Sequence, residues 1–174
     1  MKRAFLIWGL ILSGLPLIGQ NNVTPSSSSA SFRVKNLGLW VKGQIRGLYG
    51  EVRLEQDSSF IRVTLDTRAI RTGNKVRDRH LLEERFFDEA LYPTLTFVSD
   101  SIATLEGGYV AYGQLTIKDV TQSIEVPFSG SNHEYTGAFT INRKEFHVDN
   151  GEFITKGIGD AVEVNVTIQI DPNL

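Results

Sequence analysis

The last stretch of the chain alternates strictly between apolar and polar residues. Its apolar members are Val162, Val164, Val166, Ile168 and Ile170, and its polar members are Glu163, Asn165, Thr167 and Gln169. Because successive side chains of a β-strand point to opposite faces, this pattern predicts a strand with one apolar and one wet face. Shorter runs of the same period occur at residues 32–34, 61–65, 95–97, 115–117 and 124–128. An antiparallel sheet with one buried face is therefore expected.

Turn-forming residues separate these runs and predict sharp reversals of the chain. They lie at residues 56–59, 106–108, 118–119, 130–132 and 157–160 and are rich in Gly, Asp, Asn and Ser. Several short strands at this spacing predict an all-β sandwich or barrel.

The interval from Arg68 to Tyr92 interrupts the strand pattern and is too long for a structureless connection in a compact domain. Apolar residues recur within it at spacings of three and four, at Leu81, Leu82, Phe86, Phe87 and Leu91. Pro93 disfavours helical backbone at Tyr92. We therefore expect one or two short helices in this interval, which cap one end of the sheet.

The amino terminus has the character of a secretory signal peptide. Lys2 and Arg3 precede an apolar run that reaches Ile18, and a membrane-spanning helix would need about 20 apolar residues. We expect a signal peptide over residues 1–19, a flexible tether over 20–31 and a barrel domain over 32–172. Cleavage would place the protein in the periplasm or outside the cell.

Composition limits how this domain is stabilised and what it binds. The chain has no cysteine, so its apolar core must hold it together without disulfides. Loss of residues 1–19 removes Lys2 and Arg3, which leaves 18 minus 2 basic residues against 20 acidic ones and a formal charge of −4. Nucleic acid is therefore not an expected partner, because its binding relies on a basic face.

Three segments of the chain have distinctive sequences that occur in a fixed order. The first runs from Val63 to Asn74 and continues through Arg77–Leu81, Phe86–Asp88 and Tyr92–Phe97; the others are Tyr112–Thr121 and Ile141–Phe146. Together they resemble the YceI-like family of bacterial polyisoprenoid-binding proteins. The resemblance spans about residues 32–170. It implies an eight-stranded antiparallel, lipocalin-like barrel that encloses the tail of a quinone or polyprenyl lipid. We expect no enzymatic activity and no cofactor besides the bound lipid.

Inward-facing apolar residues are the expected lipid contacts. They are Phe32, Val34, Val63, Leu65, Leu81, Phe86, Phe97, Leu115, Ile117, Phe128, Phe139 and Ile141. Alternation alone does not distinguish a ligand tunnel from a packed interior, because both need apolar side chains that point inward. The pattern by itself favours a filled core, whereas the resemblance favours an open lumen.

A set of polar residues is compatible with two roles. Arg77, Asp78, His80, Asp88 and Arg143 can either contact a lipid head group or form a structural network, and we favour the structural role. The three histidines do not share a metal-ligand spacing, and no His-Glu-x-x-His motif is present, so no metal is expected.

Two other functions stay open at this point. One is a sealed barrel that acts as an interaction module of the cell envelope, and the other, less favoured, is a hydrolase of apolar substrates. No Gly-x-Ser-x-Gly nucleophile motif supports the hydrolase. The expected partner is an isoprenoid lipid or quinone, with transient membrane contact compatible with that role. The sequence leaves the oligomeric state and the ligand's head group open.

Overall fold

The computed structural model describes residues 21–54, 59–131, 133–149 and 157–171. The expected signal peptide lies outside these residues. The described strands are β1 (Asn21–Val23), β2 (Ser29–Asn36), β3 (Leu39–Arg46), β4 (Tyr49–Arg53), β5 (Phe60–Asp66), β6 (Ile70–Arg71), β7 (Thr94–Leu105), β8 (Gly108–Ile117), β9 (Val120–Ser131), β10 (Glu134–Asn142) and β11 (Ile158–Asp171). One α-helix, α1 (Lys75–Leu81), and two short 3₁₀ helices, η1 (Thr67–Ala69) and η2 (Arg143–Phe146), complete the described elements.

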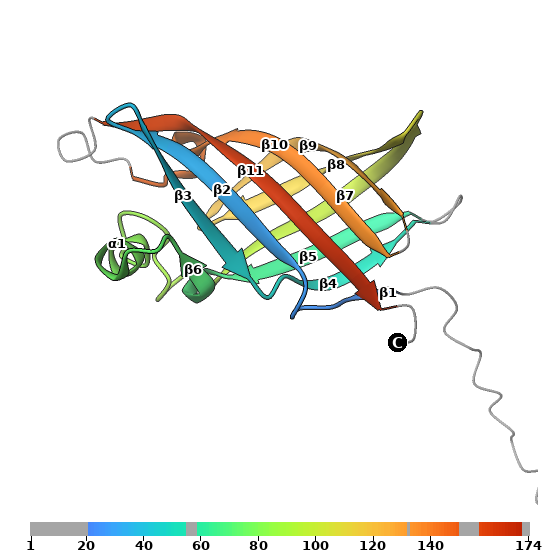
Figure 1. Cartoon of the computed structure of the whole chain (residues 1–174), viewed down its shortest axis with the longest axis horizontal. Coiled ribbons are helices and arrows are strands. Elements are labelled where there is room, and N and C mark those ends of the chain that lie inside the picture. Colours follow the sequence, from blue (N-terminus) through green and yellow to red (C-terminus); the bar gives the residue numbers. More distant parts are fainter. Residues whose placement is uncertain (1–20, 55–58, 132, 150–156, 172–174) are drawn as a thin grey trace, which may run out of the picture.

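The strands form a closed antiparallel barrel (Figure 1). The first hairpin has two arms, and each arm is interrupted once. One arm consists of β1 and β2 and the other of β3 and β4, and the arms pair through β2 with β3 and through β1 with β4. The chain then winds up and down from β5 to β11, and β11 closes the ring by pairing with both β1 and β2. When β1–β2 and β3–β4 are each counted as one interrupted strand, the described barrel has eight strands, as expected.

The segment expected to be a flexible tether, residues 20–31, is instead part of the barrel from Asn21 onward. Val23 pairs with Ile170, and Ala30 pairs with Val166. Between these two strands the hydroxyl of Ser28 accepts a 2.9 Å hydrogen bond from the Gln169 amide, and Ser28 is only 1% exposed. The expectation was wrong because it considered only apolar content. Hydrogen bonds to a neighbouring strand can order a polar segment that buries few side chains.

The Arg68–Tyr92 interval contains the expected short helix. Asn74 caps α1, because its side-chain oxygen accepts hydrogen bonds from the amides of Val76 and Arg77. The helix ends at Leu81, and residues 82–92 continue as hydrogen-bonded turns that fold back on it. Figure 1 shows α1 at one end of the barrel. No helix in the described ranges is long and apolar enough to cross a membrane.

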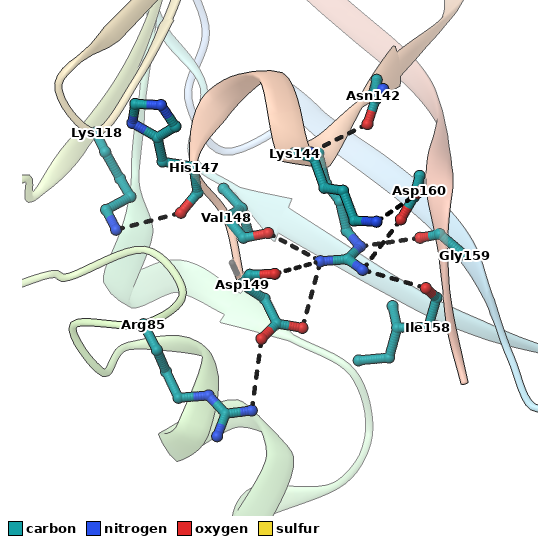
Figure 2. Close-up of polar contacts among 11 residues, drawn as sticks. Arg85, Lys118, Asn142, Lys144, His147, Val148, Asp149, Ile158, Gly159 and Asp160 are labelled. Carbon is teal, nitrogen blue, oxygen red and sulfur yellow. Dashed lines mark hydrogen bonds and ion pairs between the residues drawn. The ribbon is translucent and has the colours of Figure 1, made fainter. Parts of the chain in front are cut away.

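A buried polar network fixes the chain beside η2 (Figure 2). Arg143 is 6% exposed, and each nitrogen of its guanidinium donates. Its acceptors are the carbonyls of Val148, Asp149, Ile158 and Gly159 and the carboxylates of Asp149 and Asp160. The Asp149 side chain is 1% exposed and also pairs with Arg85 at 3.6 Å. Arg143 therefore joins the end of β10 to the start of β11 and to the chain after η2, and Asp149 extends the network to Arg85 in the turns after α1.

We predict that Arg143→Leu strongly destabilises the barrel, because it removes the buried guanidinium that bonds the Asp149 carboxylate and leaves only the longer 3.6 Å pair with Arg85 among the described residues. Removal of one partner of a buried pair costs about 3–5 kcal/mol. Arg33→Leu is the matched control: it breaks the Arg33–Glu163 pair, whose side chains are 46% and 37% exposed, and an exposed pair is worth about 1 kcal/mol or less. Urea unfolding of both variants is the measurement. Equal losses would show that the Arg143 network contributes no special stability.

Candidate functional site

The barrel encloses a cavity of about 320 Å³ whose wall is almost entirely apolar. Because alternate residues of each strand point inward, the sheet itself supplies the wall. Every apolar residue expected to face the lumen lines this cavity: Phe32, Val34, Val63, Leu65, Leu81, Phe86, Phe97, Leu115, Ile117, Phe128, Phe139 and Ile141. Contact of these side chains with a ligand stays a prediction.

Sequence reasoning missed part of the wall. Val41 and Ile45 also line the cavity, and their spacing in β3, with Gly43 between them, carried the period-two signal. Gly43 has a specific role opposite Phe32, its partner in the neighbouring strand. A Cβ atom at Gly43 would lie 2.3 Å from the Phe32 ring. The missing side chain therefore lets that ring lie against the barrel wall.

Burial of the inward side chains changes along β11, which pairs first with β2 and then with β1. At one end Val23 and Ile170 are 5% and 7% exposed, whereas the paired residues Val34 and Val162 near the other end are only partly buried. The same alternation therefore produces a closed interior at the β1 end and an accessible one where β2 ends. We call this accessible end the mouth and define it by the cavity-lining residues Asn36, Thr72, Arg77 and His80.

Three aromatic rings gather at the end opposite the mouth. Tyr109 stacks on Phe128 with ring centroids 5.1 Å apart, and Tyr135 meets both rings edge-on. Burial, and secondly the neighbouring Tyr109, raise the pKa of the Tyr135 phenol, so this group is neutral at physiological pH. Phe128 and Tyr135 also line the cavity, so this cluster contributes aromatic rather than charged groups to its wall.

The polar residues of the mouth are organised around Thr72, which sequence reasoning did not single out. The Thr72 hydroxyl donates a 2.5 Å hydrogen bond to Asp78 and accepts one of 2.8 Å from Arg77 Nε. Arg77 Nη2 donates to the Thr72 carbonyl. The hydrogen bond from the Thr72 hydroxyl lowers the pKa of the Asp78 carboxyl. Arg77 and Asp78 therefore share Thr72 as a partner and fix the start of α1 beside the lumen.

The other residues of the expected polar set do not join this group. Arg143 lines the cavity, but it bonds Asp149 and Asp160 rather than Asp88, and its nitrogens are occupied by protein acceptors. Asp88 is buried, has left-handed backbone at φ 47° and does not line the lumen. His80 lies at the mouth, exposed, 4.0 Å from Glu83. Arg77 and His80 are thus the expected polar residues best placed to meet a head group.

Metal-ligating side chains do not cluster in the described part of the chain. No three His, Cys, Asp or Glu residues there are arranged to hold a metal ion.

Known proteins with the same sequence pattern and fold provide a comparison. A UPF0312 protein of Ectopseudomonas mendocina is 28% identical over 148 residues, which cover 76% of this chain and 74% of the relative. The crystal structure of Burkholderia cenocepacia BcnA matches with a TM-score of 0.76 and 25% identity, over 84% of this chain and 98% of that one.

A third match shows the fold alone. A polyisoprenoid-binding domain from Saccharophagus degradans, implicated in plant cell wall breakdown, has a TM-score of 0.67 at 13% identity, over 88% of this chain and 98% of that one. The model of the YceI-like domain family matches residues 22–170, which include all the strands of the barrel except the outermost residue at each end. The chain therefore belongs to the YceI-like family.

Proposed function

We propose that this protein is a lipid-binding protein that holds the tail of a long isoprenoid lipid in its lumen. The observation that carries the proposal is the apolar cavity of about 320 Å³, which is closed at the β1 end and accessible at the mouth. Ligand pockets commonly measure about 300–1,000 Å³. A linear, flexible and apolar tail suits such a space better than a compact polar metabolite.

Burial of apolar groups is sufficient to drive binding. Each buried CH₂ group is worth about 0.8 kcal/mol, so one five-carbon isoprene unit contributes about 4 kcal/mol gross. A few units would offset the cost of association and ordering. No charged contact inside the barrel is required, which agrees with the composition of the cavity wall.

Family membership and the fold shared with a polyisoprenoid-binding domain support the same class of ligand. The sealed interaction module is less favoured, because it calls for a filled interior. The hydrolase gains no support from the cavity, whose polar residues lie at the mouth and in the Arg143 network.

The proposal places the protein outside the cytoplasm, after cleavage near Gly19, where it would take its lipid from a membrane. The apolar run ending at Ile18 supports export. At the mouth, Arg77 is suited to a quinone carbonyl or a phosphate oxygen, since a guanidinium donates to either. Its Nη1 atom makes no hydrogen bond to any described residue.

Phe97→Trp tests whether the interior is an open lumen. Phe97 lines the cavity, and we predict that the larger indole weakens binding of a polyprenyl quinone while the stability of the ligand-free protein changes little. In a filled core the same change would cost about 1–3 kcal/mol through overpacking. The matched control is Val98→Trp, because Val98 is the next residue of β7, on the outer face and 36% exposed.

Quinone titration and denaturant unfolding of the ligand-free proteins are the two measurements. The proposal fails if the parent protein shows no binding and Phe97→Trp loses stability. The Val98→Trp control should match the parent in both measurements.

Arg77→Ala separates structural from head-group roles at the mouth. We predict a lower melting temperature with nearly unchanged affinity for an isoprenoid alcohol, because Arg77 makes two hydrogen bonds to Thr72, each worth about 0.5–1.5 kcal/mol. Arg79→Ala, an exposed change on the same helix, is the control. Unchanged melting combined with lost quinone binding would make Arg77 a head-group contact instead.

A further inference from the structure

The turn between β2 and β3 carries exposed leucines that the fold does not require. Leu37 is 82% exposed and Leu39 is 75% exposed. Leu37 and Gly38 both have positive φ, at 50° and 83°, a two-residue hairpin geometry that strongly favours Asn-Gly or Gly-Gly. A leucine in the left-handed region is uncommon and strained. The Leu37 side chain lies beside Gly157 but is mostly exposed to solvent. An exposed leucine at a strained position suggests that its side chain contacts something outside the barrel.

Leu39 extends the wall of the lumen beyond the mouth. Residues 39, 41 and 45 of β3 point to one side, and Val41 and Ile45 line the cavity. Leu39 pairs with Asn36, which also lines the cavity at its rim. An apolar track therefore leads from Ile45 and Val41 in the cavity wall to Leu39, whose side chain is exposed to solvent. A lipid tail that follows this track stays against apolar side chains.

The outer face of the same hairpin is basic and aromatic. Lys35 pairs with Trp40, and Arg33 pairs with Lys42. The Arg33 guanidinium and the Lys35 ammonium lie 4.5 and 5.3 Å from the centre of the Trp40 ring. Trp40 is 43% exposed. This combination of cations and an accessible indole is suited to the head-group region of a membrane.

The acidic side chains on the adjacent start of β11 do not neutralise the whole basic face. Glu163 pairs with Arg33, and Asp160 pairs with Arg143 and Lys144. Within the described residues, no carboxylate forms an ion pair with Lys35 or Lys42. These two lysines provide charge complementarity to a negatively charged surface such as anionic lipid.

We propose that the tip of the β2–β3 hairpin docks on an anionic lipid bilayer. Leu37 and Leu39 enter the interface, Lys35 and Lys42 meet the head groups, and the mouth faces the membrane. Figure 1 shows this hairpin at the same end of the barrel as α1, where the lumen is accessible. Docking stands on the hairpin alone, whereas transfer of a lipid along the Leu39–Val41 track rests on the proposed function.

Trp40 provides a direct reporter of docking. The chain from Gln20 onward contains all the described strands and helices, and Trp40 is its sole tryptophan, because the other of the two is Trp8. Vesicles of phosphatidylglycerol and phosphatidylcholine, made without isoprenoid lipid, should shift Trp40 emission to the blue and co-sediment with the protein. About 1 M salt should weaken both effects, since the screening length falls to about 3 Å.

The double variant Leu37→Asn, Leu39→Asn should bind these vesicles more weakly by a factor of about ten at least, because two leucines no longer enter the interface. Asparagine suits the left-handed position at residue 37, so thermal melting should show that the variant still folds. Leu105→Asn is the matched control: Leu105 is 57% exposed beside the β7–β8 turn, at the opposite end of the barrel. It should bind vesicles as the parent does.

The proposal is overturned if the parent does not bind anionic vesicles, or if Leu105→Asn reduces binding as much as the double variant. Concentration-dependent dimerisation that the double variant abolishes, without vesicle binding, would assign the tip to a second copy of the chain instead. Titration with a polyprenyl quinone in the absence of vesicles tests the lumen separately. Its failure would count against the proposed function, and failure of vesicle binding alone would count against docking.

Discussion

Hydrogen bonds between the first and last strands enclose the space on which the rest of this structure depends. β11 pairs with β1 and β2, and Ser28 bridges the gap between these two strands through Gln169. Without that seam the sheet would have two open edges, and the apolar side chains of its inner face would meet water. Closure converts one face of a twisted sheet into the wall of a lumen. It also explains why polar residues 21–31 are ordered although they bury little apolar surface.

The two ends of the barrel differ in their chemistry: one is closed by apolar side chains, and the other is held by networks of polar side chains. The end near β1 is closed by buried aliphatic side chains such as Val23 and Ile170, and the uncharged Tyr109–Phe128–Tyr135 cluster lies at the same end. At the other end, Thr72 fixes α1 and Arg143 fixes the start of β11 through dense hydrogen bonding. These networks hold the rim in place around an interior that the aliphatic side chains do not fill. A hydrogen-bonded rim around an unfilled apolar space suits the proposed binding of an apolar tail.

The sequence predicted the features that follow from local periodicity. The alternation at Val162–Ile170 predicted a strand with one inward face, and Phe32, Phe97 and Phe139 were placed on the cavity wall for the same reason. Features that depend on distant partners were missed. The role of Ser28 depends on Gln169, 141 residues away, and the acceptors of Arg143 come from another strand and from the chain after η2. Periodicity also did not show that the interior is unfilled, because a packed core has the same pattern.

Native mass spectrometry of the intact protein, purified from its own host without detergent, would reveal whether the barrel carries a lipid. We expect one additional apolar molecule per barrel, released as a family of masses that differ by whole isoprene units. This ligand should be absent from protein refolded after extraction with organic solvent and should return when isoprenoid lipid is supplied. A barrel that carries no ligand from its host, and takes up none when supplied, does not bind isoprenoid lipid.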